Sequence, residues 1–226
     1  MYLADNYKRV KGLISNDKVT LVVVSKTHPA EKIQEIYNLG HRDFGENKVQ
    51  ELVAKAEILP KDIRWHLIGH LQSNKVKYIA GFVHLIHSVD SLGLLKEINK
   101  QGKKVNRVID CLLQIHIAEE ETKFGLDTSE VVEIVDQIKI GSLENIRICG
   151  LMGMATNTEN QAQVRKEFKS LKLVFDTLKT GEFSDNEHFN ILSMGMSGDY
   201  LMAIEEGSTM VRVGSAIFGE REYFTI

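Results

Sequence analysis

Eight short runs of apolar and β-branched residues alternate with amphipathic segments, and this alternation constrains the fold more than any other feature of the chain. Alternating strands and helices imply a parallel sheet. We expect strands at residues 21–26, 42–45, 64–68, 83–88, 107–116, 146–152, 188–192 and 210–213. Eight repeats favour an α/β fold closed into a single (β/α)8 TIM-type barrel, one domain over residues 1–226. On pattern alone, an open doubly wound sheet remains the alternative.

The segments between the strands have the residue spacing of amphipathic helices. In residues 159–179, apolar side chains recur at steps of three and four on one helix face: Val164, Phe168, Leu171, Phe175 and Leu178. We expect the other helices near residues 29–39, 46–58, 72–79, 90–101, 128–139 and 198–206, with an additional leading helix over 3–14.

Composition narrows the class of partner. The net charge of −3 gives no basic field for nucleic acid or an anionic membrane. No apolar run approaches the roughly 18 residues that span a bilayer, and the polar start does not resemble a signal peptide. We therefore expect a cytoplasmic protein without nucleic-acid or membrane partners. Cys111 and Cys149 each lie in an apolar run, which indicates buried reduced thiols.

A lysine ends the first predicted strand. Because side chains of a strand alternate between two faces, Val22, Val24 and Lys26 share one face. If that face lines the barrel, Lys26 lies at the C-terminal mouth, where barrels carry their active sites. A partly dehydrated amine there is suited to react with a carbonyl group. The alternative is a solvated lysine that merely ends the strand.

Glycine and serine residues follow the last two predicted strands. Gly195, Ser197 and Gly198 come after the seventh strand, and Gly214 and Ser215 come after the eighth. Small residues allow backbone N–H groups to approach an anion, and barrels often hold phosphate in these two loops. The two clusters together predict a phosphate site.

Arg212 stands between Val211 and Val213, so its side chain points to the opposite face of the strand. If the valines face the helices, Arg212 faces the barrel interior and needs a partner. One interpretation is a structural ion pair with a barrel carboxylate. The other uses barrel closure, which brings Arg212 near Lys26. A lysine for an aldehyde, an arginine for a ring nitrogen and a phosphate nest match pyridoxal 5′-phosphate.

Motifs along nearly the whole chain resemble those of the pyridoxal phosphate homeostasis protein family, relatives of the barrel domain of alanine racemase. They lie at residues 24–27 (VSKT), 44–51 (FGENKVQE), 65–75 (WHLIGHLQSNK), 123–125 (KFG), 150–152 (GLM) and 193–219. The resemblance implies that Lys26 forms a Schiff base with pyridoxal phosphate and that Arg212 faces the pyridine nitrogen. It places Asn47 near the cofactor ring and assigns the phosphate cradle to Ser197, Gly198, Gly214 and Ser215. One departure is Phe124, where the family often has a small residue.

Two functions fit such a site. One is a binding protein that stores, buffers or delivers pyridoxal phosphate, with pyridoxal-phosphate-dependent apoenzymes as partners. The other is a pyridoxal-phosphate-dependent amino-acid racemase, which needs a second base; in the racemase relatives this is a tyrosine from a second domain. The chain ends at Ile226, soon after the eighth strand, so we expect no such domain. An arginine at the ring nitrogen also weakens the ring as an electron sink. We therefore expect a monomeric binding protein, although Tyr200 or His66 could supply a base.

Other chemistries fit the sequence less well. The run Gly195-Met-Ser-Gly-Asp199 resembles a nucleophile elbow but lacks its final glycine and belongs to a different fold. His66 and His70 are four residues apart, yet they flank a strand end and cannot both face one metal as they would on a helix. We expect His84 and His87 to point to opposite faces of their strand, and we expect no metal ligands.

Overall fold

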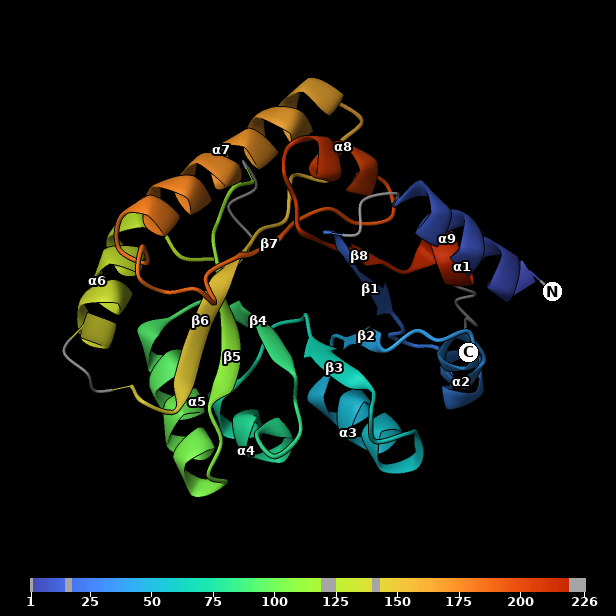
Figure 1. Ribbon diagram of the computed structural model, residues 1–226, viewed down its shortest axis with the longest axis horizontal. Helices are drawn as coiled ribbons and strands as arrows, with labels where there is room; N and C mark the ends of the chain where they lie inside the picture. Colours follow the sequence, from blue (N-terminus) through green and yellow to red (C-terminus); the bar gives the residue numbers. More distant parts are fainter. Residues whose placement is uncertain (1, 15–17, 119–124, 140–142, 220–226) are drawn as a thin grey trace, which may run out of the picture.

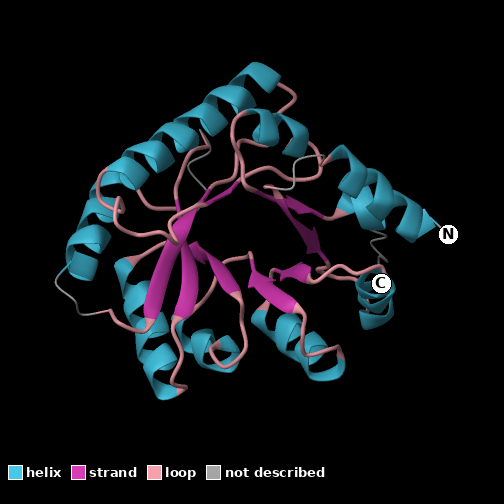
Figure 2. Ribbon diagram, viewed as in Figure 1, coloured by secondary structure: helices cyan, strands magenta, loops and turns pink. Residues whose placement is uncertain are grey.

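The strands close into a ring. The structure is a computed structural model that describes residues 2–14, 18–118, 125–139 and 143–219. Eight parallel strands follow one another in chain order, and β8 is hydrogen-bonded to β1. The helices lie outside this ring (Figures 1 and 2). The barrel prediction is confirmed, and the open-sheet alternative is wrong.

The strands and helices alternate almost without interruption. The strands are β1 Thr20–Val24, β2 Asp43–Glu46, β3 Arg64–Leu67, β4 Leu85–Val89, β5 Ile109–Gln114, β6 Ile146–Met152, β7 Ile191–Ser193 and β8 Met210–Val213. The α-helices are α1 Tyr2–Leu13, α2 Ala30–Asn38, α3 Val49–Ile58, α4 Val76–Ile79, α5 Leu92–Lys104, α6 Thr128–Lys139, α7 Gln161–Thr180, α8 Tyr200–Glu205 and α9 Ser215–Phe218, with a 3₁₀ turn η1 at Ser73–Lys75.

The predicted and observed boundaries differ mainly at strand ends. Strand β1 stops at Val24, so Lys26 lies in the turn that follows rather than in the strand. Strand β7 begins at Ile191 instead of residue 188, because Asn186 and His188 form a turn closed by a hydrogen bond of 3.0 Å. Helix α9 was not expected, since its four residues are too few to show a periodicity.

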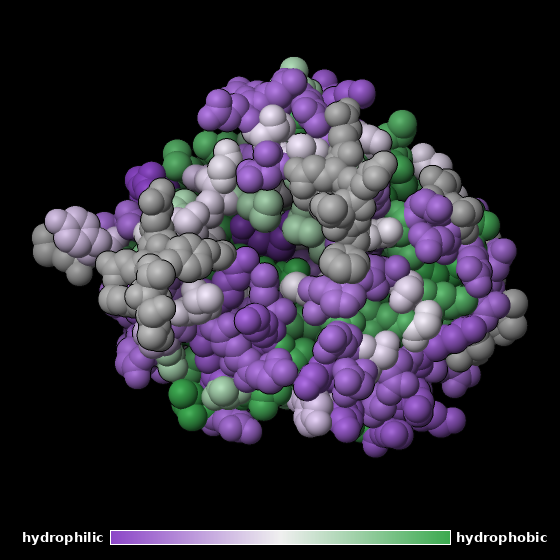
Figure 3. All heavy atoms as spheres, turned by 180° about the vertical axis from the view of Figure 1, so that it is seen from behind, coloured by the Kyte–Doolittle hydropathy of each residue, from purple (hydrophilic) through white to green (hydrophobic). Residues whose placement is uncertain are grey.

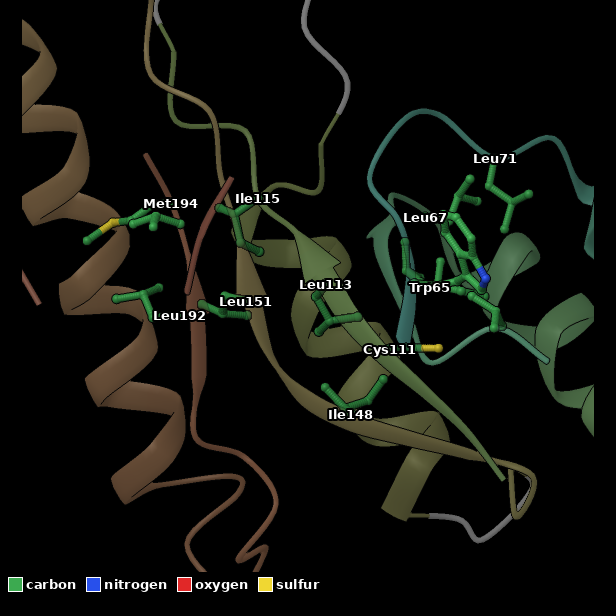
Figure 4. Packing of buried hydrophobic residues seen from close by; sticks show 14 of the residues in the cluster. Trp65, Leu67, Leu71, Cys111, Leu113, Ile115, Ile148, Leu151, Leu192 and Met194 are labelled. Carbon is green, nitrogen blue, oxygen red and sulfur yellow. The ribbon is translucent and has the colours of Figure 1, made fainter. Parts of the chain in front are cut away.

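Side chains of the strands alternate between two apolar cores. The outward-facing side chains pack under the helices; Figure 4 shows Leu113 of β5, Leu151 of β6 and Leu192 of β7 in this layer. The inward-facing side chains form a smaller cluster inside the barrel: Val22, Leu85, Leu112, Cys149, Met152 and Met210. Both cysteines are buried and free, as the sequence predicted.

Two strands carry an irregularity that changes where their side chains point. In β4, one extra residue lies between Ile86 and Val89, opposite Cys111 to Leu113 of β5. In β6, Gly150 adopts a φ of 149°, and a Cβ atom there would lie 1.8 Å from the carbonyl oxygen of Ile191. Only glycine fits such a backbone without strain, and bulges of this kind often lie beside functional sites.

One of the matching motifs falls mostly outside the described residues. Of the matching segment at 123–125, only Gly125 is described, so the departure at Phe124 lies outside the described residues. Among the helices of the described ranges, none combines the length and the apolar character needed to cross a membrane.

Candidate functional site

One pocket collects all the residues that the sequence assigned to a cofactor. It has a volume of about 410 Å3 and opens at the C-terminal ends of the strands. Its lining includes Lys26, Asn47, Ser197, Gly198, Arg212, Gly214 and Ser215. Figure 3 shows the molecule hollowed near the centre of one face, with hydrophilic residues at the bottom of the hollow. These residues come from four separate segments that only barrel closure brings together.

The turn that carries Lys26 is held from both sides. Before the lysine, the Ser25 hydroxyl donates to Glu46 Oε1 at 2.6 Å, and Lys55 Nζ donates to the Ser25 carbonyl at 2.8 Å. After the lysine, Thr27 has a φ of 67°, and its backbone N–H donates to Glu51 Oε1 at 2.5 Å. A positive φ is costly for a β-branched residue, so it persists only where neighbours enforce it. Lys26 is thus fixed by its two neighbours in the chain.

Those neighbours depend on a small ionic cluster between β2 and α3. Lys55 Nζ donates to Glu46 Oε1 and to Glu51 Oε1, each at 2.7 Å. Burial raises the pKa of Glu46 to about 7, although the hydrogen bonds and charge of Lys55 and the Ser25 hydroxyl act in the opposite direction. Among the described residues, Glu46 Oε2 has no hydrogen-bond partner. This Glu46–Lys55–Glu51 cluster therefore supports the lysine turn, and the pKa of one of its carboxyl groups, that of Glu46, lies near neutral pH.

Arg212 lies inside the barrel, as expected, on the strand beside β1. Its register partner in β1 is Val22. One guanidinium nitrogen donates to the Ser193 carbonyl at 2.9 Å and to the Ser193 hydroxyl at 2.7 Å, and the other donates to the Gly153 carbonyl at 3.1 Å. Burial lowers the pKa of Arg212 to about 10, and Asp199 opposes this shift. Within the described residues, the partners of Arg212 are carbonyl and hydroxyl oxygens, which does not support the ion-pair interpretation.

The loops after β7 and β8 meet at Ser197. Its hydroxyl accepts from the backbone N–H groups of Gly214 at 3.1 Å and Ala216 at 3.4 Å. Because the hydroxyl accepts from these N–H groups, its own proton remains available for an acceptor between the two loops. Helix α8 begins at Tyr200 rather than at residue 198, so Ser197 and Gly198 belong to the loop itself. Loop N–H groups and hydroxyls, rather than a long helix, offer the donors for an anion here.

Several pocket residues were missed from the sequence. They are His28, Ile68, Gly69, His70, Gln114, Met154, Met196 and Gly219. His28 stacks on Phe218 with ring centres 4.2 Å apart, and His70 Nδ1 lies 3.1 Å from Asp90 Oδ2. All but Gly219 end a strand or follow one within a few residues. The rule that barrel sites form at strand ends could have found them.

The two residues considered as further bases do not line this pocket. His66 lies toward the N-terminal mouth, in a second hollow that also includes Asp43 and His84. Tyr200 is buried and lines a neighbouring hollow. The prediction that His84 and His87 point to opposite faces is wrong. Both rings contact His66, with centres 5.4 and 5.2 Å away, because His84 precedes β4 and is not bound by strand alternation.

Potential metal ligands also gather at the N-terminal mouth. Atoms of Asp43, His66 and His84 lie within 4.8 Å of one another. Both oxygens of Asp43 already accept hydrogen bonds from Arg64, and Oδ1 lies 3.1 Å from His66 Nε2. The carboxylate is therefore committed to an ion pair. His70 lies in the other mouth, so His66 and His70 do not share a site.

Fold and site together define a class: a (β/α)8 barrel whose C-terminal mouth presents a lysine after β1, an arginine in β8 and two serine–glycine loops. Comparison with known proteins agrees with this class. The family described as alanine racemase, N-terminal domain, matches residues 2–222. A pyridoxal phosphate homeostasis protein of Aquifex aeolicus (strain VF5) is 43% identical over 208 residues, which cover 90% of this chain and 87% of that protein. The chain therefore belongs to the pyridoxal phosphate homeostasis protein family.

Solved structures show the same fold. PipY of Synechococcus elongatus PCC7942, in a structure without PLP, superposes with a TM-score of 0.88 at 34% identity and covers 96% of this chain and 100% of its own. PipY with PLP bound gives a TM-score of 0.82 at 32% identity, with the same coverage. An alanine racemase from Bartonella henselae has a TM-score of 0.76 at 17% identity, covering 98% of this chain and 61% of its own, and shows the fold alone.

Proposed function

We propose that this protein binds pyridoxal 5′-phosphate at the C-terminal mouth of its barrel and acts in the homeostasis of that cofactor by storing, buffering or delivering it. The observation that carries the proposal is the convergence of Lys26, Arg212 and the loops after β7 and β8 on one pocket. PipY, with PLP bound in a solved structure at 32% identity, supports the choice of ligand.

Each part of the pocket suits one part of this ligand. Lys26 would hold the aldehyde as a Schiff base, since its turn fixes the amine at the mouth. Arg212 would face the ring nitrogen, and Asn47 would lie near the ring. The phosphate would bind the hydroxyl and N–H groups of the two loops, namely Ser197, Gly198, Gly214 and Ser215. When bound, pyridoxal phosphate supplies a reactive aldehyde and an electron-withdrawing ring.

The same geometry favours holding the ligand over turnover. A guanidinium group is a donor only, so facing the ring nitrogen it keeps that nitrogen an unprotonated acceptor and weakens the ring as an electron sink. Neither His66 nor Tyr200 lines the pocket to act as a second base. We therefore include in the proposal a monomeric, cytoplasmic protein that acts as one domain, with pyridoxal-phosphate-dependent apoenzymes as its recipients. An amino-acid racemase is the alternative.

Chemical trapping tests the assignment of Lys26. Protein incubated with pyridoxal phosphate should absorb visible light, and borohydride should fix the ligand to a peptide that contains Lys26. The Lys26→Ala variant should lose the visible absorbance while keeping some affinity through the phosphate loops. Lys75→Ala is the matched control and should behave like the wild type, because it removes a half-buried lysine whose Nζ lies 5.7 Å from the centre of the Tyr78 ring. Labelling of Lys48 or Lys75 in place of Lys26 would refute the assignment.

A transfer assay tests the homeostatic role. The loaded protein is mixed with an apoenzyme that needs pyridoxal phosphate, and recovery of that enzyme's activity is followed over time. Delivery should be faster than from the same concentration of free ligand in the presence of a competing amine, because a held aldehyde is protected from that amine. Recovery no better than with free ligand would count against delivery.

A further inference from the structure

A chain of polar side chains crosses the interior of the barrel, where apolar residues are the rule. It begins at Arg212 and passes through Ser193, His87 and His66 to Asp43. All five side chains are buried, and His87 and Ser193 have no exposed surface. Burying this many polar groups is costly unless every one of them is hydrogen-bonded. We call these five residues the Arg212–Asp43 chain.

The contacts are continuous from one end to the other. Arg212 donates to the Ser193 hydroxyl at 2.7 Å, and Ser193 Oγ lies 3.1 Å from His87 Nδ1. His87 Nε2 lies 2.9 Å from His66 Nδ1, and His66 Nε2 lies 3.1 Å from Asp43 Oδ1. The chain thus joins the cofactor pocket, which Arg212 lines, to the hollow at the opposite mouth, which Asp43 and His66 line.

With one proton on each imidazole, the two ends set the direction of every hydrogen bond between them. A guanidinium group has no acceptor, so Ser193 Oγ accepts from Arg212 and keeps its own proton, which it can give to His87 Nδ1. At the other end, burial alone would raise the pKa of Asp43, but hydrogen bonds from Arg64 and His66 hold it below its ordinary value, so the carboxylate only accepts. His66 therefore carries its proton on Nε2, and its Nδ1 accepts from His87 Nε2–H. Every bond in the chain points from Arg212 toward Asp43.

The irregularity in β4 belongs to this arrangement. The extra residue between Ile86 and Val89 changes the register beside His87. The neighbouring Ser88 is buried, and its hydroxyl has no partner among the described residues. Bulges commonly re-aim a side chain near a functional site. Here the polar contacts go to His87, while the hydroxyl next to it stays unused.

We propose that Ser193, His87, His66 and Asp43 are positioning residues, which hold the Arg212 guanidinium toward the ring nitrogen of the ligand through a hydrogen-bonded chain of one fixed direction. This inference rests on the proposed function for the identity of the ligand. The chain itself is a property of the protein without ligand. Arg212 needs such support because its described partners are neutral oxygens rather than a carboxylate.

Histidine NMR tests the chain without any ligand. In protein labelled with 15N-histidine and 15N-arginine, His66 and His87 should both carry their proton on Nε2. A scalar coupling should connect His87 Nε2 to His66 Nδ1 across the hydrogen bond. The Arg212 side-chain N–H signals should exchange slowly. A proton on Nδ1 of either ring, or the absence of that coupling, would refute the direction proposed for the Arg212–Asp43 chain.

Variants test whether the chain positions Arg212. Ser193→Ala should shift the His87 Nδ1 resonance and speed the exchange of the Arg212 side-chain protons, whereas Ser193→Thr, which keeps the hydroxyl, should restore both. Ser88→Ala is the matched control, because it removes a buried hydroxyl beside His87 that takes no part in the chain. Unchanged Arg212 signals in a folded Ser193→Ala protein would refute the positioning role.

Ligand preference gives the second readout. Wild-type protein should bind pyridoxal phosphate more tightly than the analogue with a C–H group in place of the ring nitrogen. Ser193→Ala should reduce that preference on the order of tenfold, as expected for the loss of one charge-assisted hydrogen bond. If the wild type binds neither ligand while the NMR signals are as described, the proposed function fails and the chain stands. If it binds both and Ser193→Ala leaves the preference unchanged, the inference fails and the proposed function stands.

Discussion

Replacing Glu46 by glutamine should stabilise the protein at alkaline pH and leave its stability almost unchanged at acidic pH. Glu46 is fully buried, and its carboxyl group accepts from Ser25 and Lys55, beside the turn that carries Lys26. Glutamine has nearly the same shape as the protonated acid and cannot ionise. The substitution therefore isolates the effect of the charge.

The magnitude follows from the pKa of Glu46. Burial raises this pKa from 4.5 to about 7, so the native state holds the proton over a pH range where the unfolded chain has released it. Stability from this group is complete below pH 4.5 and is lost as the pH rises through 7. A difference of 1 between the folded and unfolded pKa corresponds to about 1.4 kcal/mol, so the total loss of stability is about 3 kcal/mol. Glu46→Gln should escape that loss and be more stable than the wild type by this amount at pH 8.

Urea unfolding from pH 4 to pH 8 measures the effect as the difference in unfolding free energy between variant and wild type. The difference should be near zero at pH 4, below the unfolded pKa, and should grow in favour of Glu46→Gln up to pH 8. Glu57→Gln, an exposed glutamate on the same helix as Lys55, controls for the loss of a carboxylate. A variant that is less stable than the wild type at pH 8 would refute the reasoning, because the Lys55 ion pair would then outweigh the cost of burial.

Three further predictions concern the cradle, the fold and the reaction. Ser197→Ala combined with Ser215→Ala should weaken binding of pyridoxal phosphate far more than binding of unphosphorylated pyridoxal, and equal weakening of both would contradict the cradle. Gly150→Ala should cost at least about 3 kcal/mol in urea unfolding, because its Cβ would collide with the Ile191 carbonyl, while Gly93→Ala, which has open space, should cost nothing. Solvent deuterium should not enter the α-carbon of L- or D-amino acids. Exchange with inversion that Lys26→Ala abolishes would instead show a racemase.

Much of the pocket could be predicted because strand alternation is a local rule. Val22, Val24 and Lys26 share the inner face of the first strand and its extension, and Arg212 faces inward between two valines, as the sequence indicated. The position of each residue relative to its own strand then follows from counting by twos. The pairing of β8 with β1 then places Arg212 beside Val22, on the strand next to the one that leads to Lys26.

The polar interior could not be predicted in the same way. His66, His87 and Ser193 lie on three different strands, and their contacts depend on register and on a bulge that leaves no clear trace in the sequence. His66 was considered as a base at the C-terminal mouth, yet it points into the barrel toward Asp43. Long-range hydrogen bonds between single side chains are set by the assembled structure, so a local pattern does not reveal them.

Because the pocket lies across the β1–β8 seam, a bound ligand would also have a mechanical role. At that seam the first and last strands of the chain meet, and Thr20–Val23 pairs with Met210–Val213. Beside it, Asn6 and Arg9 of α1 donate to the carbonyl oxygens of Ile217 and Ala216. A molecule bonded to Lys26 at one end and to the loops after β7 and β8 at the other would link the first and last strands of the barrel. Binding of the ligand would then act as a reversible circularisation of the polypeptide. It would oppose opening of the barrel between β1 and β8, so amide hydrogen exchange should slow first in these two strands. The ligand-free and ligand-bound proteins would therefore differ in the rate at which they unfold. Chaperones and proteases, which act on unfolded protein, would then act more often on the ligand-free form.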